Sequence, residues 1–156
     1  MNNIYFKIIS ISILFFLISH SAINAQSWSQ LGKSINGDAL DFLGSSLDIS
    51  GDGQTVIVGS PGHTKIENGS FSYEVGKTSV YQWITSIDDW VLKGSPLLGE
   101  NDYDYFGTSV SISGDGEVIA VSAPSNDMAG ADAGAVTIYA WNGGAWAKKG
   151  STILGD

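Results

Sequence analysis

The chain has 156 residues and a formal net charge of −9, and it contains no arginine and no cysteine. Binding to nucleic acids requires cationic side chains that replace the counterions of the phosphates, so a chain with sixteen carboxylates and seven lysines is not expected to bind them. Without cysteine the fold cannot rely on disulfides, and packing must hold it together.

Residues 1–25 have the layout of a secretory signal peptide. Lys7 precedes an apolar run at residues 8–18, and small residues follow up to Ala25. The run is shorter than the roughly 20 residues that a membrane helix needs. We therefore predict cleavage before Gln26, a protein that is secreted or held at the cell surface, and no membrane span after cleavage.

An internal repeat organises the remaining residues. Trp28, Trp90 and Trp146 begin the related phrases WSQLGKSINGD, WVLKGSPLLGE and WAKKGSTILGD. Between them, DFLGSSLDISGDGQTVIVGSP aligns with DYFGTSVSISGDGEVIAVSAP. Self-similarity of this kind is typical of repeat architectures. The repeat predicts an outer strand at residues 28–37, a first unit at 38–99 and a second unit at 100–156.

Each repeat unit is expected to form four short β-strands. Leu47 and Ile49 alternate with polar residues, as do Val110 and Ile112. The next runs, TVIVGS and EVIAVSA, are apolar at nearly every position, which is typical of strands covered on both faces. The third strands are TSVYQWI and AVTIYAW, and the fourth begin at the tryptophans. No helical stripe follows the signal peptide, so we predict an all-β fold without a sizeable helix.

Repeat units whose strands are apolar on both faces need a neighbouring unit packed against each face. The radial packing of four-stranded blades in a β-propeller supplies such neighbours, and we predict a partial propeller of two blades preceded by one outer strand. A stacked sandwich or a solenoid is the alternative architecture. Two blades alone would leave apolar faces exposed, so we expect further blades in a longer protein, or self-association.

The motifs around these strands resemble the FG-GAP repeat of integrin alpha chains and of many exported bacterial proteins. Phe106-Gly107 carries the first half of the motif, and Leu43-Gly44 stands at its place in the first unit. Residues 59–61 and 122–124 each differ from Gly-Ala-Pro at one position. The resemblance implies a β-propeller that serves cell adhesion or ligand binding outside the cell, without catalysis.

Two other functions stay open. Paired carboxylates in acidic loops could serve a hydrolase, because glycoside hydrolysis uses two of them. The loop carboxylates in question are Asp38, Asp41, Glu100, Asp102 and Asp104. Charges of this kind are also found as solvated loop residues. The third possibility is a structural spacer without a ligand.

The phrase Ser-Gly-Asp-Gly, at residues 50–53 and again in the second unit, has two interpretations. The resemblance implies a calcium loop, whose weak candidate ligands are Asp48, Ser50 and Asp52, but the ninth position of that loop is Val56. Calcium takes roughly six to eight oxygen ligands, which this set does not supply. Alternatively, Asp-Gly forms a tight hairpin turn. We expect the turn and no cofactor, and calcium remains the alternative.

The two units differ most in one loop, because residues 62–75 replace the shorter 125–133. Polar and aromatic side chains on a loop held by a rigid scaffold suit contact with a protein or carbohydrate ligand at a cell surface. The candidate ligand-binding residues are His63, Lys65, Phe71 and Tyr73 in the longer loop, and Asn126, Asp127 and Asp132 in the shorter one. The alternative is that both loops are solvated connections.

Overall fold

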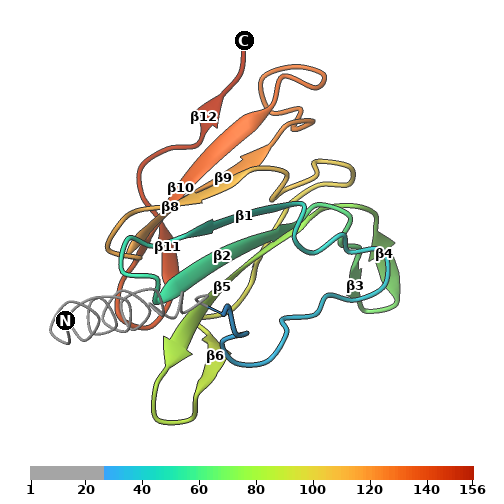
Figure 1. The fold of residues 1–156 in the computed structure, drawn as a ribbon. Helices are drawn as coiled ribbons and strands as arrows, with labels where there is room; N and C mark the ends of the chain where they lie inside the picture. The colour runs from blue at the N-terminus through green and yellow to red at the C-terminus, as the bar shows by residue number, and fades with distance from the viewer. Residues whose placement is uncertain (1–26) are drawn as a thin grey trace, which may run out of the picture. The chain divides into compact units, whose positions relative to one another are not determined.

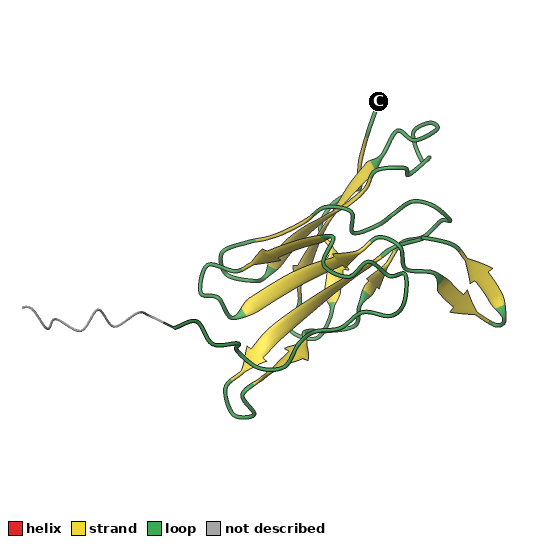
Figure 2. Ribbon diagram, turned by 45° about the vertical axis from the view of Figure 1, so that its right-hand side comes forward, coloured by secondary structure: helices red, strands yellow, loops and turns green. Residues whose placement is uncertain are grey.

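The computed structural model describes residues 27–156, of which residues 31–156 form one compact unit. All regular structure in the described residues is β-strand, as Figures 1 and 2 show. The all-β prediction is therefore confirmed. The predicted signal peptide, residues 1–25, lies outside the described part of the chain. Among residues 27–156, no helix is long and apolar enough to cross a membrane.

The first repeat unit forms an antiparallel sheet that we call sheet 1. Its strands lie in the order β1 (Ser46–Ile49), β2 (Thr55–Ser60), β5 (Lys77–Ile84) and β6 (Asp89–Leu92), and the short β7 (Leu97–Leu98) also pairs with β5. The apolar run of β2 lies inside the sheet, where both of its faces are covered, as its composition predicts. In the longer loop between β2 and β5, β3 (Lys65–Glu67) and β4 (Ser70–Ser72) form a separate hairpin.

The second repeat unit forms sheet 2 with the same connectivity. Its strands are β8 (Val110–Ile112), β9 (Val118–Ala123), β10 (Ala135–Trp141) and β11 (Trp146–Lys148), with the short β12 (Ile153–Leu154) pairing with β10. The registers also correspond, because Ile57 lies opposite Val80 in sheet 1 and Ala120 lies opposite Ile138 in sheet 2. The predicted pair of four-stranded units is confirmed.

The hydrophobic core lies between the two sheets. Sheet 1 contributes Ile57 and Val80, and sheet 2 contributes a larger group that includes Phe106, Ile119 and Val121. All of these side chains are buried. Because apolar burial is the main favourable term in folding, neither sheet has a complete core without the other. The partners of Ile57 and Val80 come from a repeat unit that follows them in the chain.

Glycine allows the two sheets to approach closely at one end. A Cβ atom at Gly59 would overlap the carbonyl oxygen of Gly107 in sheet 2. Close by, Gly76 forms a parallel bridge with Phe106, and the Phe106 N–H donates to the carbonyl of Val75. Side chains larger than hydrogen would push the sheets apart here. The Phe-Gly and Gly-Ser-Pro motifs therefore meet in space, one from each repeat.

Polar contacts join the sheets along β1 and β8. The Asp48 carboxylate accepts hydrogen bonds from the Ser111 hydroxyl at 3.0 Å and from the Ile112 N–H at 2.9 Å. These hydrogen bonds lower the pKa of Asp48. The Gly51 N–H donates to the Gly114 carbonyl at 2.8 Å, so the two Ser-Gly-Asp-Gly turns lie side by side.

Lys93 and Trp146 lock the outer parts of the sheets together. The Lys93 ammonium group is buried and donates to the Gly116 carbonyl at 2.9 Å and to Glu117 at 2.7 Å. It also lies 5.5 Å and 5.6 Å from the ring centroids of Trp141 and Trp146, within cation–π range. In return, the Trp146 indole N–H donates to the Lys93 carbonyl at 2.8 Å.

The expected outer strand at residues 28–37 differs from the structure, in which the first strand begins at Ser46. A strand forms only where its backbone hydrogen bonds pair in register with a neighbouring strand, and none of the strand pairings in the described residues includes this segment. The part from residue 31 onward still contacts sheet 1, since the Trp90 indole N–H donates to the Leu31 carbonyl at 3.2 Å and the Lys33 N–H donates to Asp89 at 3.0 Å.

The buried ammonium group of Lys93 generates a stability prediction. We expect Lys93→Met to lower the free energy of unfolding by about 2 kcal/mol, because it removes the hydrogen bonds that a buried charged group donates. Lys149 holds the equivalent position in the second repeat and is exposed, so Lys149→Met should change stability by less than about 0.5 kcal/mol. Urea unfolding of both variants measures the difference, and equal effects would contradict this account of the interface.

Candidate functional site

The longer loop and its hairpin surround the larger of the hollows on sheet 1. The hollow has a volume of about 770 Å³ and lies between the β3–β4 hairpin and the loop that precedes β1. Its lining combines apolar side chains with charged ones. The residues that line it include Asp38, Leu40, Asp41, His63, Lys65, Ile66, Glu67, Phe71 and Leu98. Three predicted ligand-binding residues, His63, Lys65 and Phe71, are therefore brought together.

The β3–β4 hairpin has a two-residue turn at Asn68-Gly69. The pairing of Glu67 with Ser70 leaves these two residues in the turn, and both have positive φ, 53° and 81°. Asn-Gly is the preferred pair for a turn of this kind because both residues adopt positive φ at low cost. The prediction of four strands per unit missed this hairpin, although the Asn-Gly pair in the sequence signals it. Lys65 and Glu67 form an ion pair of 2.6 Å on the hairpin.

Three aromatic rings form a row beside the hairpin. Phe71 and Tyr73 lie with ring centroids 6.1 Å apart and nearly parallel planes, and Tyr73 and Tyr103 lie 6.4 Å apart in the same manner. All three side chains are about half exposed. The Tyr103 N–H donates to the Tyr73 carbonyl at 2.8 Å, which brings the second repeat against the loop of the first. Phe71 and Tyr73 were predicted site residues, whereas Tyr103 was not.

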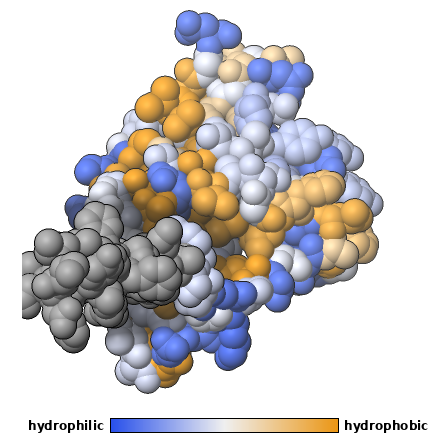
Figure 3. Space-filling view, in the orientation of Figure 1, coloured by the Kyte–Doolittle hydropathy of each residue, from blue (hydrophilic) through white to orange (hydrophobic). Residues whose placement is uncertain are grey.

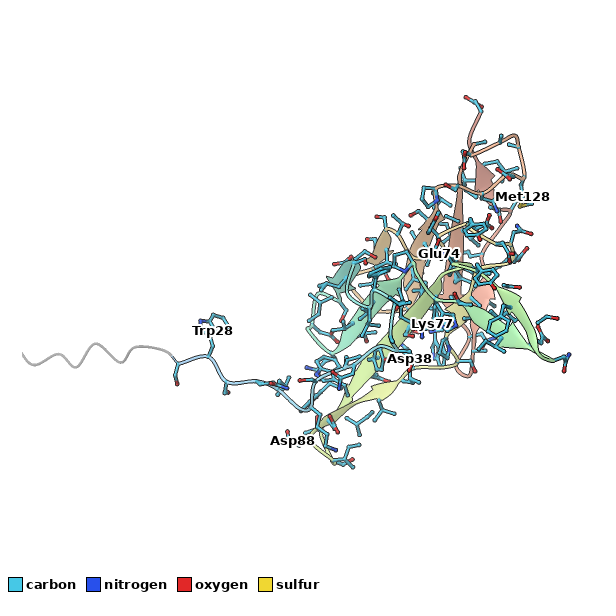
Figure 4. The ribbon with its side chains drawn as sticks, turned by 90° about the vertical axis from the view of Figure 1, so that its right-hand side faces the viewer. Trp28, Asp38, Glu74, Lys77, Asp88 and Met128 are labelled. Atoms are coloured by element: carbon cyan, nitrogen blue, oxygen red, sulfur yellow. The ribbon has the colours of Figure 1, made fainter. Side chains whose placement is uncertain are left out.

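A buried carboxylate holds the base of the hollow. Asp41 is only 4% exposed, and it pairs with the His63 Nδ1 atom at 3.0 Å and with the Lys77 ammonium group at 2.5 Å. Burial raises the pKa of Asp41, but hydrogen bonds from Lys77 and His63 and their charges outweigh it, so the pKa lies below its ordinary value of 3.8. Asp38 lies 4.0 Å from Lys77, and Figure 4 shows these two side chains together.

The second repeat has the same buried carboxylate with uncharged partners. The Asp104 side chain accepts hydrogen bonds from the Asn126 amide at 2.8 Å and from the Asn101 amide at 3.1 Å. Asn126 stands where His63 lies in the first repeat, and it is itself buried. This candidate residue therefore positions the loop from within and lies away from the exposed surface.

The two remaining candidates, Asp127 and Asp132, belong to the short loop of the second repeat. The Asp132 N–H donates to the Asp127 carboxylate at 2.7 Å, so Asp127 shapes its own loop. Asp127 also lines a smaller hollow of about 360 Å³ with Asn101, Asp102, Asp104 and Met128. The structure thus separates these candidates from those of the hairpin, which line a different hollow.

Both Ser-Gly-Asp-Gly phrases form turns with the same hydrogen bonds. In the first, the Ser50 hydroxyl donates to Asp52 at 2.6 Å and accepts from the Thr55 N–H, while the Gln54 N–H also donates to Asp52. The hydrogen bond from Ser50 is the main cause of the lowered pKa of Asp52. Ser113 and Asp115 repeat the pattern in the second phrase. The oxygens of Asp48, Ser50 and Asp52 thus take part in protein hydrogen bonds.

Comparison with known families identifies one of the two repeats. The family model of the FG-GAP repeat matches residues 99–139, which run from the end of sheet 1 through most of sheet 2. This range includes Phe106-Gly107 and residues 122–124, the motifs that lie at the contact between the sheets. No curated protein sequence matches the chain.

The turn hydrogen bonds lead to a prediction about metal binding. We expect calcium not to bind tightly at residues 48–56, because position nine is Val56 and the polar oxygens of the turn already have partners. Among residues 27–156, no group of three or more histidine, aspartate or glutamate side chains is placed to hold a metal ion. Calorimetric titration with calcium should give no heat from a site of micromolar affinity, and a tight site abolished by Asp52→Ala would contradict the prediction.

The pKa of Asp41 predicts how stability depends on pH. Because the folded-state pKa lies below the unfolded value near 3.8, Asp41 stabilises the fold above that pH, and this contribution is lost as the pH falls through the folded pKa. Asp41→Asn should lower the free energy of unfolding by about 2 kcal/mol at pH 7, and the difference from wild type should shrink towards pH 3. Urea unfolding at both pH values tests this, with the exposed Asp102→Asn as control. A difference that is the same at both pH values would contradict it.

Proposed function

We propose that this FG-GAP repeat protein is a noncatalytic binding module that acts outside the cell, secreted or at the cell surface, in adhesion or ligand recognition. The signal-peptide layout of residues 1–25 and the resemblance to integrin-type repeats motivate the location. The recognition surface in this proposal is the β3–β4 hairpin with the row of rings beside it. The ligand is a protein or a carbohydrate.

One observation carries the proposal, the exposed row of Phe71, Tyr73 and Tyr103. Large apolar side chains normally lose solvent exposure on folding, and contiguous exposed groups of them mark binding surfaces. Aromatic rings offer a large rigid contact area at a small cost in conformational entropy, which is why they are enriched where proteins bind. Figure 3 shows hydrophobic side chains at the surface on the right of the view, in the region of the hairpin.

The surroundings of the row suit a ligand with both apolar and polar groups. The hollow that Phe71 lines combines apolar side chains with charged ones, such as Asp38, Lys65 and Glu67. Sugar rings and protein side chains both present such mixed surfaces. The Asp41 cluster fixes the loop from beneath, so the surface is held in shape before the ligand arrives, and preorganisation of this kind favours affinity.

Experiments distinguish this binding function from the two alternatives, a hydrolase and a structural spacer. A hydrolase would use loop carboxylates such as Asp102 and Asp104, and a hydrolytic activity lost in Asp102→Asn would support it. Asp104 is buried and accepts hydrogen bonds from two side-chain amides. This arrangement also holds the short loop of the second repeat in place. A spacer would show no ligand in any screen.

Removal of the rings tests the binding surface. We expect the triple variant Phe71→Ser, Tyr73→Ser and Tyr103→Ser to bind at least about tenfold more weakly, because central aromatic contacts commonly contribute 1.4 kcal/mol or more, roughly a factor of ten. Binding is measured on an array of oligosaccharides and on immobilised extracellular proteins, with the wild type first identifying the ligand.

A matched control separates this effect from a general loss of surface hydrophobicity. Ile87→Ser with Leu92→Ser removes two exposed apolar side chains from the β5–β6 hairpin, away from the ring row. This control should bind like the wild type. Equal binding by the triple variant, with its circular dichroism spectrum preserved, would refute the proposed surface.

A further inference from the structure

One contact between a tryptophan pair and a glycine occurs twice. Gly94 packs against Trp141 and Trp146, and a Cβ atom there would lie 2.7 Å from the Trp141 ring. The Trp146 indole N–H donates to the carbonyl of the preceding residue, Lys93. We call this arrangement the tryptophan clasp. It joins the end of sheet 1 to sheet 2.

The same clasp closes on the segment that precedes sheet 1. Gly32 packs against Trp83 and Trp90, with a Cβ position 2.8 Å from the Trp83 ring. The Trp90 indole N–H donates to the carbonyl of the preceding residue, Leu31. The segment at residues 31–37 therefore takes the position on sheet 1 that residues 93–99 take on sheet 2.

A third copy of the glycine has no clasp. Lys149-Gly150 repeats the sequence position of Lys93-Gly94, and both of its residues are exposed. No heavy atom lies within 4 Å of a Cβ position at Gly150 beyond its chain neighbours. The backbone φ angle is nearly the same in the two places, 82° at Gly150 and 81° at Gly94.

The outer face of sheet 2 is open where the equivalent face of sheet 1 is covered. Val80 is buried against sheet 2, whereas its counterpart Ile138 is only half-buried, and Ile153, the counterpart of the half-buried Leu97, is 60% exposed. A mainly apolar hollow of about 410 Å³ lies on this face, lined by residues that include Gly134, Val136, Ile153 and Gly155. We call this surface the tail face, and it lies around β10 and β12, where Figure 3 shows hydrophobic groups.

The opposite face of sheet 1 is covered less than the equivalent face of sheet 2 along β1 and the loop before it, although Val58 in β2 is buried there. Ile112 in sheet 2 is 9% exposed, and its counterpart Ile49 in sheet 1 is 51% exposed. Phe106 is buried against sheet 1, whereas its counterpart Leu43 is half-buried and Gly44 is exposed. We call this surface the head face. Head and tail faces are thus the two halves of a contact that the chain already makes once internally.

We propose that the tail face of one copy binds the head face of a second copy, in the manner in which sheet 1 binds sheet 2. Gly134 stands where Gly76 receives the Phe106 backbone, and Gly155 stands where Gly99 lies against the Phe106 Cβ atom, so the two would receive the loop at Leu43. Such a head-to-tail contact is heterologous and extends to rings or chains. Ser122 replaces Gly59 on the tail face, so the second copy sits slightly farther away.

The segment at residues 31–37 competes with this association. It occupies the tryptophan pair of sheet 1, which Gly150 of an incoming copy needs for its own clasp. A segment tethered by a short linker acts at an effective concentration in the millimolar range. The wild type therefore associates only at high protein concentration, and a variant that loosens residues 31–37 associates at lower concentration.

Opposite effects of the same substitution at two equivalent glycines test the proposal. Gly32→Glu introduces a side chain into the clasp on sheet 1, and Gly150→Glu introduces it into the open one, with similar backbone conformations of φ 68° and 82°. Sedimentation velocity of the purified chains should show Gly32→Glu reaching at least twice the single-copy mass at micromolar concentration. Gly150→Glu and the double variant should keep the single-copy mass.

A second measurement does not depend on the folding of the glycine variants. At millimolar concentration the wild type should exceed the single-copy mass, and Ile153→Asp, which alters an exposed side chain of the tail face, should restore it. Wild-type protein that stays at the single-copy mass at that concentration, or association that Ile153→Asp leaves unchanged, overturns the proposal.

Discussion

The close approach of two glycine-lined backbones governs how the two sheets fit together. At Gly59 and Gly76 of sheet 1 there is no room for a side chain beside Phe106 and Gly107 of sheet 2. This contact places the Phe106 ring in the core, where it meets Tyr139 edge-on at 6.4 Å between ring centroids. It also sets where the loops at the same end of the sheets lie. Tyr103 reaches the hairpin of the first repeat because the segment from Tyr103 to Phe106 runs beside residues 73–75.

The two repeats solve one structural problem with different chemistry. Each has a buried aspartate before its first strand, Asp41 or Asp104, that needs partners because an isolated buried charge is costly. In the first repeat a lysine and a histidine serve as partners, and in the second two asparagine amides do. The scaffold is therefore conserved between the repeats while the surface above it differs. The ring row and the larger hollow occur above the charged version, with the hairpin insertion.

Residues at equivalent positions of the two repeats differ in solvent exposure, because a different neighbour packs against each repeat. Ile49 and Ile112 hold the same place in their sheets and have similar side chains, yet only Ile112 is buried. The difference lies in what packs against them and not in the strands themselves. Repeat proteins bury a continuous core by stacking, so the burial of a residue in one sheet depends on the sheet that packs against it.

The strands and their turns were determined by the sequence itself, because alternation, apolar runs and Asp-Gly pairs act over a few neighbouring residues. The all-β class, the two four-stranded units and the turn at Ser50–Gly53 follow from these local patterns. The fate of individual side chains depended on contacts between residues far apart in the chain. Asn126 looks like an exposed loop residue but is buried against Asp104. Lys93 resembles any surface lysine, yet its ammonium group is buried over the rings of two tryptophans of the next repeat. Residues 28–37 repeat the phrase that begins the fourth strand of each unit, but a strand needs a partner for its backbone hydrogen bonds, and only the tertiary structure shows whether one is there.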